Sequence, residues 1–201
     1  MDTNALFKIG YGLYVLTAHE NGKDNGCIIN TVMQVTSDPL QIAIAVNKKN
    51  YTNEMISRTR KFNVSTLAEG ANFDLFKNFG FQSGKEVNKF ETFSDVKRSN
   101  NGVLYITQNT NSYMSAYVQK EIDLGTHTMF IGQLVDAVCF NDISTVTYDF
   151  YQKNIKPKPE AAPQKKGWRC KICGYIYDGE ELPPDFICPL CKHGAVDFEK
   201  I

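Results

Sequence analysis

Four cysteines near the C-terminal end of the chain have the spacing of a metal site. Cys170, Cys173, Cys188 and Cys191 form two Cys-x-x-Cys pairs that are separated by fourteen residues. Four thiolates in two such pairs provide a tetrahedral sulfur site, a geometry that suits zinc or a single iron rather than calcium, magnesium or copper(II). We therefore expect residues 167–201 to form a small metal module.

The identity of the metal decides what this module can do, because zinc has no redox chemistry whereas iron held by four sulfurs carries one electron. The residues after each pair, Gly174 and Lys192, allow the chain to fold back so that backbone N–H groups point at the sulfurs. Five aromatic side chains would keep water away from the metal: Trp168, Tyr175, Tyr177, Phe186 and Phe198. These features favour iron, and a structural zinc ribbon is the alternative. Zinc ribbons that bind nucleic acid usually carry a basic face, whereas residues 168–201 hold four Lys/Arg against six Asp/Glu.

The string WRCKICGYIYDGEELPPDFICPLCKHGAVDFEKI resembles rubredoxin, the one-iron electron carrier. The resemblance is carried by Cys-x-x-Cys-Gly-Tyr-Ile-Tyr-Asp, by Pro-Asp-Phe and by Cys-Pro-Leu-Cys. The loop between the two cysteine pairs is shorter than is usual in that family, as it is in rubredoxin-like tails that are fused to other redox proteins. The resemblance implies one iron bound by Cys170, Cys173, Cys188 and Cys191.

The composition of the 201 residues is that of a globular protein, with 42% hydrophobic residues and a formal net charge of zero. A balanced charge gives no reason to expect nucleic acid or an anionic membrane as a partner. Without an apolar run of eighteen residues or a secretory signal, we expect the protein to stay in the cytoplasm. There the two remaining cysteines, Cys27 and Cys139, should be buried, reduced thiols.

Residues 1–151 are dominated by strand patterns with short helices between them. A turn over residues 19–26 contains two Asn-Gly dipeptides of the kind that close hairpins. Short helices are expected from Thr52 or Asn53 and over residues 72–79. Six or more consecutive strands joined by turns fit a closed or nearly closed antiparallel barrel. The expected strands are 13–18, 27–36, 40–46, 62–67, 103–107, 115–122, 128–140 and 144–148.

A possible anion site precedes the first helix, where Lys48 and Lys49 lie beside the exposed N–H groups of the helix start. The alternative is an ordinary charged turn. Neither a Gly-x-Gly-x-x-Gly string after a strand nor a P-loop string is present, so a Rossmann dinucleotide domain and a P-loop are unsupported.

Three strings in this region, NGCIINTVMQVTSDPLQIAIAVNKKNYT, FGFQSGKEVNKF and DLGTHTMFIGQL, resemble the flavin reductase family. The resemblance covers nearly all of residues 1–151 and implies an FMN-binding split β-barrel. It implies that His127 lies near the flavin or the incoming nicotinamide, although Thr126 stands where family members often have Asp. The residues implied to bind FMN are Asn30, Thr31, Val32 and Met33 at the isoalloxazine, Asn47, Lys48, Asn50 and Thr52 at the phosphate, and Ser83, Gly84 and Lys85 from the next loop.

The linker between the two expected domains, residues 152–166, contains three prolines, five lysines and one glutamate. It has too few apolar residues to fold, and we interpret it as a spacer rather than as a docking site for an acidic partner. The chain is thus expected to hold a flavin domain over 1–151 and a rubredoxin-like domain over 167–201.

The combination of these two domains resembles the high-molecular-weight rubredoxins, which pass electrons to flavodiiron proteins that reduce O₂ or NO. It implies that electrons pass from NADH or NADPH through FMN to the iron and then to an acceptor protein, in a homodimer. Two alternatives remain open. One is a flavin or ferric reductase in which the tail is accessory, and the other is an FMN-binding protein with a zinc ribbon.

Overall fold

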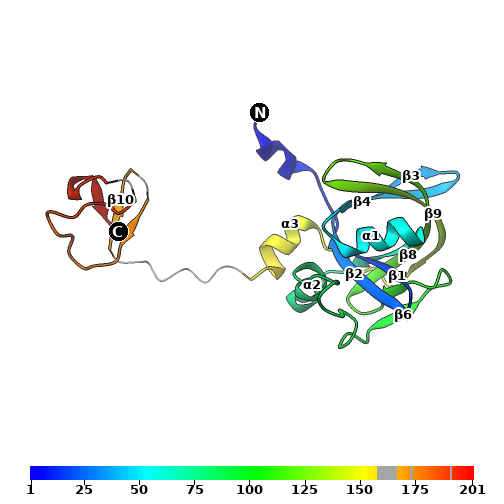
Figure 1. Ribbon diagram of the computed structural model, residues 1–201. Coiled ribbons are helices and arrows are strands. Elements are labelled where there is room, and N and C mark those ends of the chain that lie inside the picture. Colours follow the sequence, from blue (N-terminus) through cyan, green and yellow to red (C-terminus); the bar gives the residue numbers. More distant parts are fainter. Residues whose placement is uncertain (158–166, 173, 191) are drawn as a thin grey trace. The chain divides into compact units, whose positions relative to one another are not determined.

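The computed structural model describes residues 1–157, 167–172, 174–190 and 192–201. The chain divides into two compact units, Met1–Lys156 and Pro157–Ile201 (Figure 1). The first unit ends in a π-helical turn, η2 (Tyr151–Ile155), so residues 152–155, which the sequence assigned to the linker, are helical. Cys173, Cys191 and residues 158–166 of the expected linker lie outside the described residues. No helix of the described residues is long and apolar enough to cross a membrane.

The first unit is built on a seven-stranded sheet with the strand order β2-β1-β5-β8-β9-β4-β3. Every neighbouring pair in this sheet is antiparallel. The strands are β1 (Tyr14–Glu20), β2 (Lys23–Ile29), β3 (Val32–Ser37), β4 (Leu40–Asn47), β5 (Lys61–Leu67), β8 (Thr110–Asp123) and β9 (His127–Cys139). A two-stranded sheet pairs β6 (Val96–Arg98) with β7 (Leu104–Ile106). The helices are η1 (Thr3–Lys8), α1 (Tyr51–Thr59), α2 (Phe73–Gly80) and α3 (Tyr148–Phe150).

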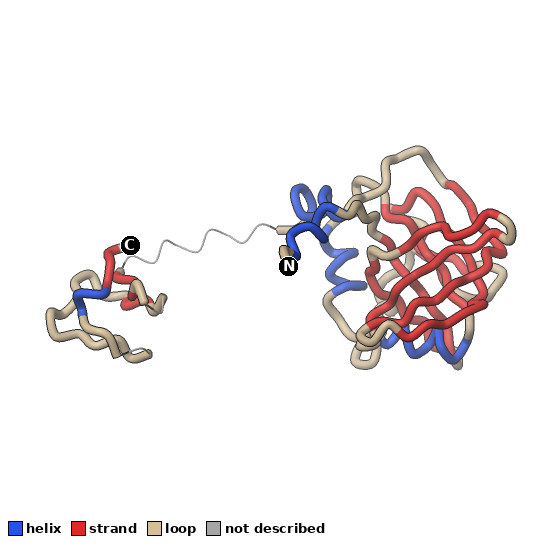
Figure 2. Tube along the Cα trace, turned by 90° about the horizontal axis from the view of Figure 1, so that it is seen from above, coloured by secondary structure: helices blue, strands red, loops and turns tan. Residues whose placement is uncertain are grey.

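The sheet closes on itself because of one short connection. Strands β2 and β3 are the two edges of the sheet, yet only Asn30 and Thr31 separate them in the chain. Two residues span at most about 7 Å, so the sheet must curl until its edges approach each other. The curled sheet is seen from above in Figure 2. The expected mainly β, barrel-like fold is therefore confirmed, and the barrel is split where β2 passes into β3.

The interior of the barrel is filled by aliphatic and aromatic side chains from both halves of the sheet. Phe62 of β5 and Phe130 of β9 are fully buried in one cluster with Ile44 of β4. A Cβ at Gly132 would lie 2.7 Å from the ring of Phe62, so only glycine allows this ring to pack against β9. A second cluster joins α2 to β1 through Phe76, Phe79 and Val15.

Several boundaries differ from the expected ones. The expected turn over residues 19–26 is wrong, because the hairpin closes on Asn21 and Gly22 alone and the flanking residues pair as strands. Residues 144–148 form only isolated bridges, through Thr145 and Thr147, and not a strand.

The two cysteines of the first unit differ in burial. Cys27 is buried as expected, whereas Cys139 is exposed at the end of β9.

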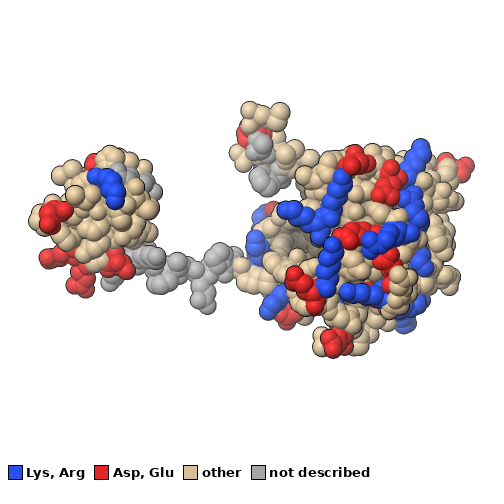
Figure 3. Space-filling model, in the orientation of Figure 1, with Lys and Arg blue, Asp and Glu red and all other residues tan. Residues whose placement is uncertain are grey.

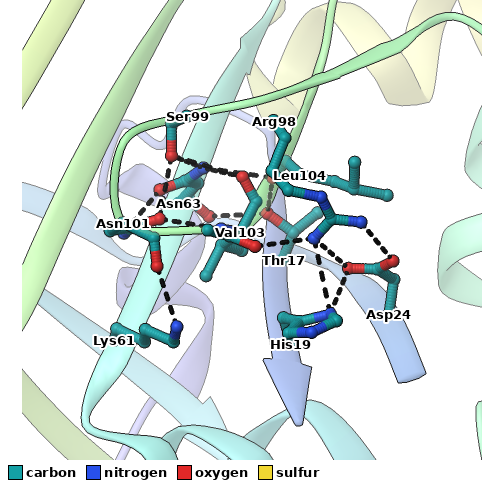
Figure 4. Close-up of polar contacts among 11 residues, drawn as sticks. Thr17, His19, Asp24, Lys61, Asn63, Arg98, Ser99, Asn101, Val103 and Leu104 are labelled. Carbon is teal, nitrogen blue, oxygen red and sulfur yellow. Dashed lines mark hydrogen bonds and ion pairs between the residues drawn. The ribbon is translucent and has the colours of Figure 1, made fainter. Parts of the chain in front are cut away.

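A buried polar network holds the loop between β6 and β7 against the barrel (Figure 4). Asn63 of β5 is fully buried, and its amide nitrogen lies 2.8 Å from the Ser99 hydroxyl and 2.9 Å from the Val103 carbonyl. Its amide oxygen accepts a hydrogen bond of 3.0 Å from Asn101. Beside this network, the Arg98 guanidinium pairs with Asp24 of the β1–β2 hairpin at 2.8 Å. All buried side-chain polar atoms of the described residues have partners.

We predict that Asn63→Ala lowers the free energy of unfolding by about 3 kcal/mol, because it leaves buried partners in the β6–β7 loop without hydrogen bonds. Urea unfolding of the whole chain measures this loss. The control is Asn100→Ala in the same loop, since Asn100 is exposed and should tolerate truncation within about 0.5 kcal/mol. Equal stabilities of the two variants would contradict the role assigned to the network.

The second unit is a three-stranded sheet with the order β11-β10-β12. Its strands are β10 (Trp168–Cys170), β11 (Ile176–Tyr177) and β12 (Phe198–Lys200), and a short 3₁₀ turn, η3 (Ala195–Asp197), precedes β12. Cys170, Cys188 and Phe198 form its buried centre, and the other four expected aromatic residues pack around them. The aromatic shell that the sequence predicts is therefore present.

The two cysteine knuckles repeat the same backbone geometry. The N–H of Cys170 donates to the carbonyl of Tyr175, and the N–H of Cys188 donates to the carbonyl of His193, both at 2.8 Å. The residue four positions after each cysteine donates back to it at 2.9 Å, from Gly174 and Lys192 respectively. Both of these residues have positive φ, +77° at Gly174 and +61° at Lys192. Each of the two buried cysteines thus begins one of two matching knuckles.

The positive φ values in the two knuckles predict opposite changes in the stability of the metal-loaded module for two substitutions. Gly174→Ala should destabilise the metal-loaded module by about 1 kcal/mol, because an alanine resists positive φ although its Cβ would meet no atom within 4 Å. Lys192→Gly should stabilise it by up to about 1 kcal/mol for the converse reason. The temperature of metal release measures both. Gly194→Ala is the control, since Gly194 has φ −81° and also has open space around it. A loss at Gly194 as large as that at Gly174 would refute the backbone explanation.

Candidate functional site

Two cavities lie beside the strands that the sequence singles out. The first, the split cavity, has a volume of about 470 Å³ and lies where β2 passes into β3. The second, the helix cavity, has a volume of about 250 Å³ and lies at the N-terminal end of α1. The split cavity is lined by Ile9, Gly10, Tyr11, Gly12, Tyr14, Asn30, Thr31, Val32, Met33, Ala43, Ile44, Ala45 and Met129. The helix cavity is lined by Asn25, Cys27, Lys49, Asn50, Tyr51, Thr52, Gly80, Phe81, Gln82, Ser83, Gly84 and Lys89.

All four residues expected at the isoalloxazine line the split cavity. Thr31 is held in place by its hydroxyl, which donates to the Ala45 carbonyl at 2.6 Å, and its carbonyl accepts from the Ala45 N–H at 3.3 Å. The Asn30 side chain makes no hydrogen bond within the described part of the chain, so its amide is available to a ligand. Met33 is 61% exposed at the rim. An apolar cavity with a few polar groups at one end suits a flat aromatic ring system.

Two of the four residues expected at the phosphate, Asn50 and Thr52, line the helix cavity. Ser83 and Gly84, which were expected to approach the cofactor from the next loop, line it too. Asn50 is the N-cap of α1, but its side chain does not cap the helix. The amide of Asn50 and the free N–H groups of the first helical turn are thus available to an anion, which the helix dipole also attracts. A negatively charged group therefore fits this cavity.

The other three residues of these two groups, Asn47, Lys48 and Lys85, line neither cavity. The Lys48 ammonium pairs with Asp123 at 2.6 Å, and the Lys85 ammonium pairs with Glu54 at 2.5 Å. The side-chain oxygen of Asn47 accepts from the N–H of Lys49 at 2.9 Å. Each of these side chains is thus engaged within the protein.

His127 begins β9, and its backbone lies opposite Asn47 of β4. Its Nδ1 lies 2.9 Å from the hydroxyl of Thr126. The imidazole is half-buried and lines neither cavity. The structure therefore pairs His127 with Asn47 in the sheet but places it in neither cavity, and its catalytic role stays a prediction.

Sequence reasoning missed the floor of the helix cavity. The amide of Asn25 donates to the Thr52 hydroxyl at 2.9 Å, and both side chains are buried. Burial raises the pKa of the Cys27 thiol and lowers the pKa of the Lys89 ammonium. Lys89 lies in the same string as Ser83 and Lys85, but lysines are seldom buried, so nothing in the spacing indicated which lysine points inward.

Two of the four expected metal ligands, Cys170 and Cys188, are among the described residues. Cys170 and Cys188 are 1% and 0% exposed, and each begins one of the two matching knuckles. Their expected partners, Cys173 and Cys191, are outside the described residues. Buried thiols in knuckles with an aromatic shell fit a four-thiolate iron site.

Basic side chains gather on the face of the first unit that carries α1, with acidic side chains among them (Figure 3). Several of these form ion pairs, such as Arg58 with Glu20 and Arg60 with Glu121. Lys23 lies over the ring of Tyr51 at 5.0 Å, and Lys85 lies over it at 5.7 Å. The rim of the helix cavity is therefore basic, because Tyr51 and Lys49 both line the cavity.

Comparison with protein families gives two matches in one chain. Residues 6–157 match the family described as the flavin reductase like domain. Residues 168–199 match the rubrerythrin, rubredoxin-like domain. The first match covers the sheet and both cavities, and the second covers both cysteine knuckles.

Individual relatives match either the whole chain or a large part of it. The high molecular weight rubredoxin of Moorella thermoacetica is 36% identical over the whole of both chains. The ferric-chelate reductase (NAD(P)H) of Archaeoglobus fulgidus is 40% identical over 79% of this chain and 93% of its own. Among solved structures, the flavin reductase PheA2 is 26% identical with a TM-score of 0.61, over 73% of this chain and 93% of its own.

These matches extend over both units and agree with the split barrel and the cysteine knuckles. The rubredoxin-like domain implies iron and the flavin reductase-like domain implies a flavin. The protein is thus an electron-transfer oxidoreductase, and the chain belongs to the flavin reductase-like family, in the two-domain form of the high molecular weight rubredoxins.

Proposed function

We propose that the protein takes electrons from NADH or NADPH onto bound FMN and passes them to an iron held by Cys170, Cys173, Cys188 and Cys191. The observation that carries this proposal is the presence, in one chain, of two cavities suited to the two ends of a flavin nucleotide and of two thiolate knuckles. The ferric-chelate reductase relative, whose name includes NAD(P)H, supports a nicotinamide as the donor.

The two cavities are connected by shared strands. Strand β2 contributes Cys27 to the helix cavity, and the chain that follows it contributes Thr31 to the split cavity. Four residues of extended chain span about 13 Å, a length comparable to that of a flavin mononucleotide. Ala43 of β4 lines the split cavity, and the same strand leads directly into α1 and the helix cavity. One elongated ligand can therefore place its rings in one cavity and its phosphate in the other, which favours FMN.

When bound, a flavin accepts a hydride and returns electrons singly, so it can join a two-electron donor to a one-electron metal. The residues of the chain position it. Thr31, fixed by Ala45, and the amide of Asn30 would offer polar contacts to the rings, and Met33 and Met129 would offer apolar ones. The aromatic shell of the second unit excludes water from the metal. Because the two domains share one chain, their effective concentration is about millimolar.

The electron acceptor in this proposal is a flavodiiron protein, and the reaction takes place in the cytoplasm. The first statement rests on the resemblance to high molecular weight rubredoxins, and the second rests on the sequence alone.

Stopped-flow reduction tests the relay. With NADH or NADPH in excess, flavin absorbance should fall first and the ferric-thiolate bands should follow. Cys188→Ser should abolish the second phase by removing a buried thiolate, and it should leave flavin reduction at its wild-type rate. Flavin that bleaches while the iron of the wild-type protein stays oxidised would refute the relay, and a purified protein that holds only zinc would refute the electron-transfer role of the second unit.

A second function is favoured by the similarity to the ferric-chelate reductase, namely reduction of an external ferric complex by the first domain. It differs from the relay in one measurable respect. Turnover of a ferric chelate that is as fast in Cys188→Ser as in the wild type would support this second function over the relay.

We also propose that the protein forms a homodimer through the edge of the sheet beside the split cavity. Three apolar side chains are exposed there, Met33 at 61% and Val35 and Leu40 at 44% each. Apolar side chains grouped at one edge are typical of an interface between subunits.

Val35→Glu should therefore shift the dimer towards monomer in light scattering, because it places a charge in the interface. Val196→Glu is the matched control, since Val196 is 86% exposed in the second unit. A wild-type monomer that retains stoichiometric FMN would contradict the dimer.

A further inference from the structure

Two lysines of the second unit stand directly beside expected metal ligands in the chain. Lys171 follows Cys170, and Lys192 follows Cys191. The backbone N–H of Lys192 also donates to the carbonyl of Cys188 at 2.9 Å, so Lys192 is adjacent to two of the four expected ligands. Both lysine side chains are exposed. Two cationic side chains are thus attached next to the ligands.

The charges of the second unit are unevenly distributed around these ligands. Residues 168–201 hold six acidic and four basic residues. Of the basic ones, Arg169 forms an ion pair with a carboxylate of β12, and Lys200 lies over an aromatic ring of β10. Neither Lys171 nor Lys192 takes part in an ion pair within the described part of the chain. The two basic side chains beside the ligands are therefore those without a described partner.

Lys192 also has a backbone conformation that favours glycine. Its φ is +61°, and the corresponding residue of the other knuckle is Gly174. Three other non-glycine residues of the described chain have positive φ. Two are asparagines, which tolerate this conformation, and the third, Arg60, forms an ion pair with Glu121. No contact among the described residues explains the side chain of Lys192, and an unfavourable residue kept at such a place indicates a role for its charge.

A positive charge beside a four-thiolate iron has a definite effect on the reduction of the metal. When the iron takes one electron from the flavin, no bond is formed or broken, and the negative charge of the site rises by one unit. A nearby cation stabilises the more negative form. At a separation of about 10 Å near a protein surface, one cation favours reduction by about two- to tenfold.

We propose that the charges of Lys171 and Lys192 raise the reduction potential of the metal in the second unit and so favour electron transfer from the flavin to the iron. This inference rests on the proposed function and deepens it, because it names residues that favour one direction of transfer. It also explains the conformation of Lys192. Lys192→Gly, which should stabilise the metal-loaded module, should at the same time make it a poorer electron acceptor.

The reduction equilibrium of the iron is measured in the whole protein by titration with a chemical reductant, so that the result does not depend on transfer from the flavin. Lys192→Gly and Lys192→Met should each shift the equilibrium towards the ferric form by about two- to tenfold, and Lys171→Met should act in the same direction. Lys192→Arg is the matched control, because it keeps the charge and should leave the equilibrium unchanged. The differences should shrink as salt is added, since exposed charges are screened.

The two neutral variants at position 192 separate the charge from the backbone. Lys192→Gly relieves the positive φ and is therefore expected to fold. A shift in Lys192→Gly without one in Lys192→Met would assign the effect to the backbone and overturn the inference. The wild-type equilibrium in all three neutral variants would also overturn it and would leave the proposed function standing. A wild-type protein without iron would instead overturn the proposed function, and the inference with it.

Discussion

The short connection between β2 and β3 is the constraint on which the flavin domain depends. Asn30 and Thr31 must bridge the two edges of a seven-stranded sheet, so the sheet curls, and the antiparallel hairpin of β8 and β9 has to bend with it. The pairing of this hairpin shifts register at Ser115/Ala116 and again at Val118/Lys120, and such bulges increase local twist. The connection that closes the barrel also carries the polar residues of the split cavity, so closure and ligand binding depend on the same few residues.

The features that sequence predicts well are those set by local chemistry. Strands rich in Val, Ile and Thr, the four-cysteine spacing and the aromatic shell follow from residue types and short spacings. The expected turn over residues 19–26 failed for a tertiary reason. Asn25 and Gly26 are strand residues because Asn25 bonds Thr52 of α1 and Gly26 packs against Phe79 of α2. Contacts from distant elements overrode the turn preference of an Asn-Gly pair.

In the candidate site, too, some residues could be predicted from the sequence and others depend on contacts with distant parts of the chain. Residues 30–33 were implied by the resemblance to the flavin reductase family, and all four line the split cavity. The lysines could not be ranked, since each has the same chemistry and only the fold decides where its ammonium lies. Asp123 and Glu54 engage Lys48 and Lys85 at the surface, while Lys89 is directed inward by the loop that follows α2. Partners that are 75, 31 and 63 residues away leave no signal in a local pattern.

The two domains differ in how their sites relate to their stability. The flavin domain has two apolar clusters of its own, so its fold does not require a ligand, and its cavities can bind and release one. Among its described residues, the second unit has three buried hydrophobic ones, of which two are cysteines. A core this small cannot offset the entropy lost on folding. The thiolate–metal bonds must supply that stability. An electron carrier benefits from this arrangement, because the bonds that hold the fold together also keep the ligand geometry rigid when the metal changes its charge.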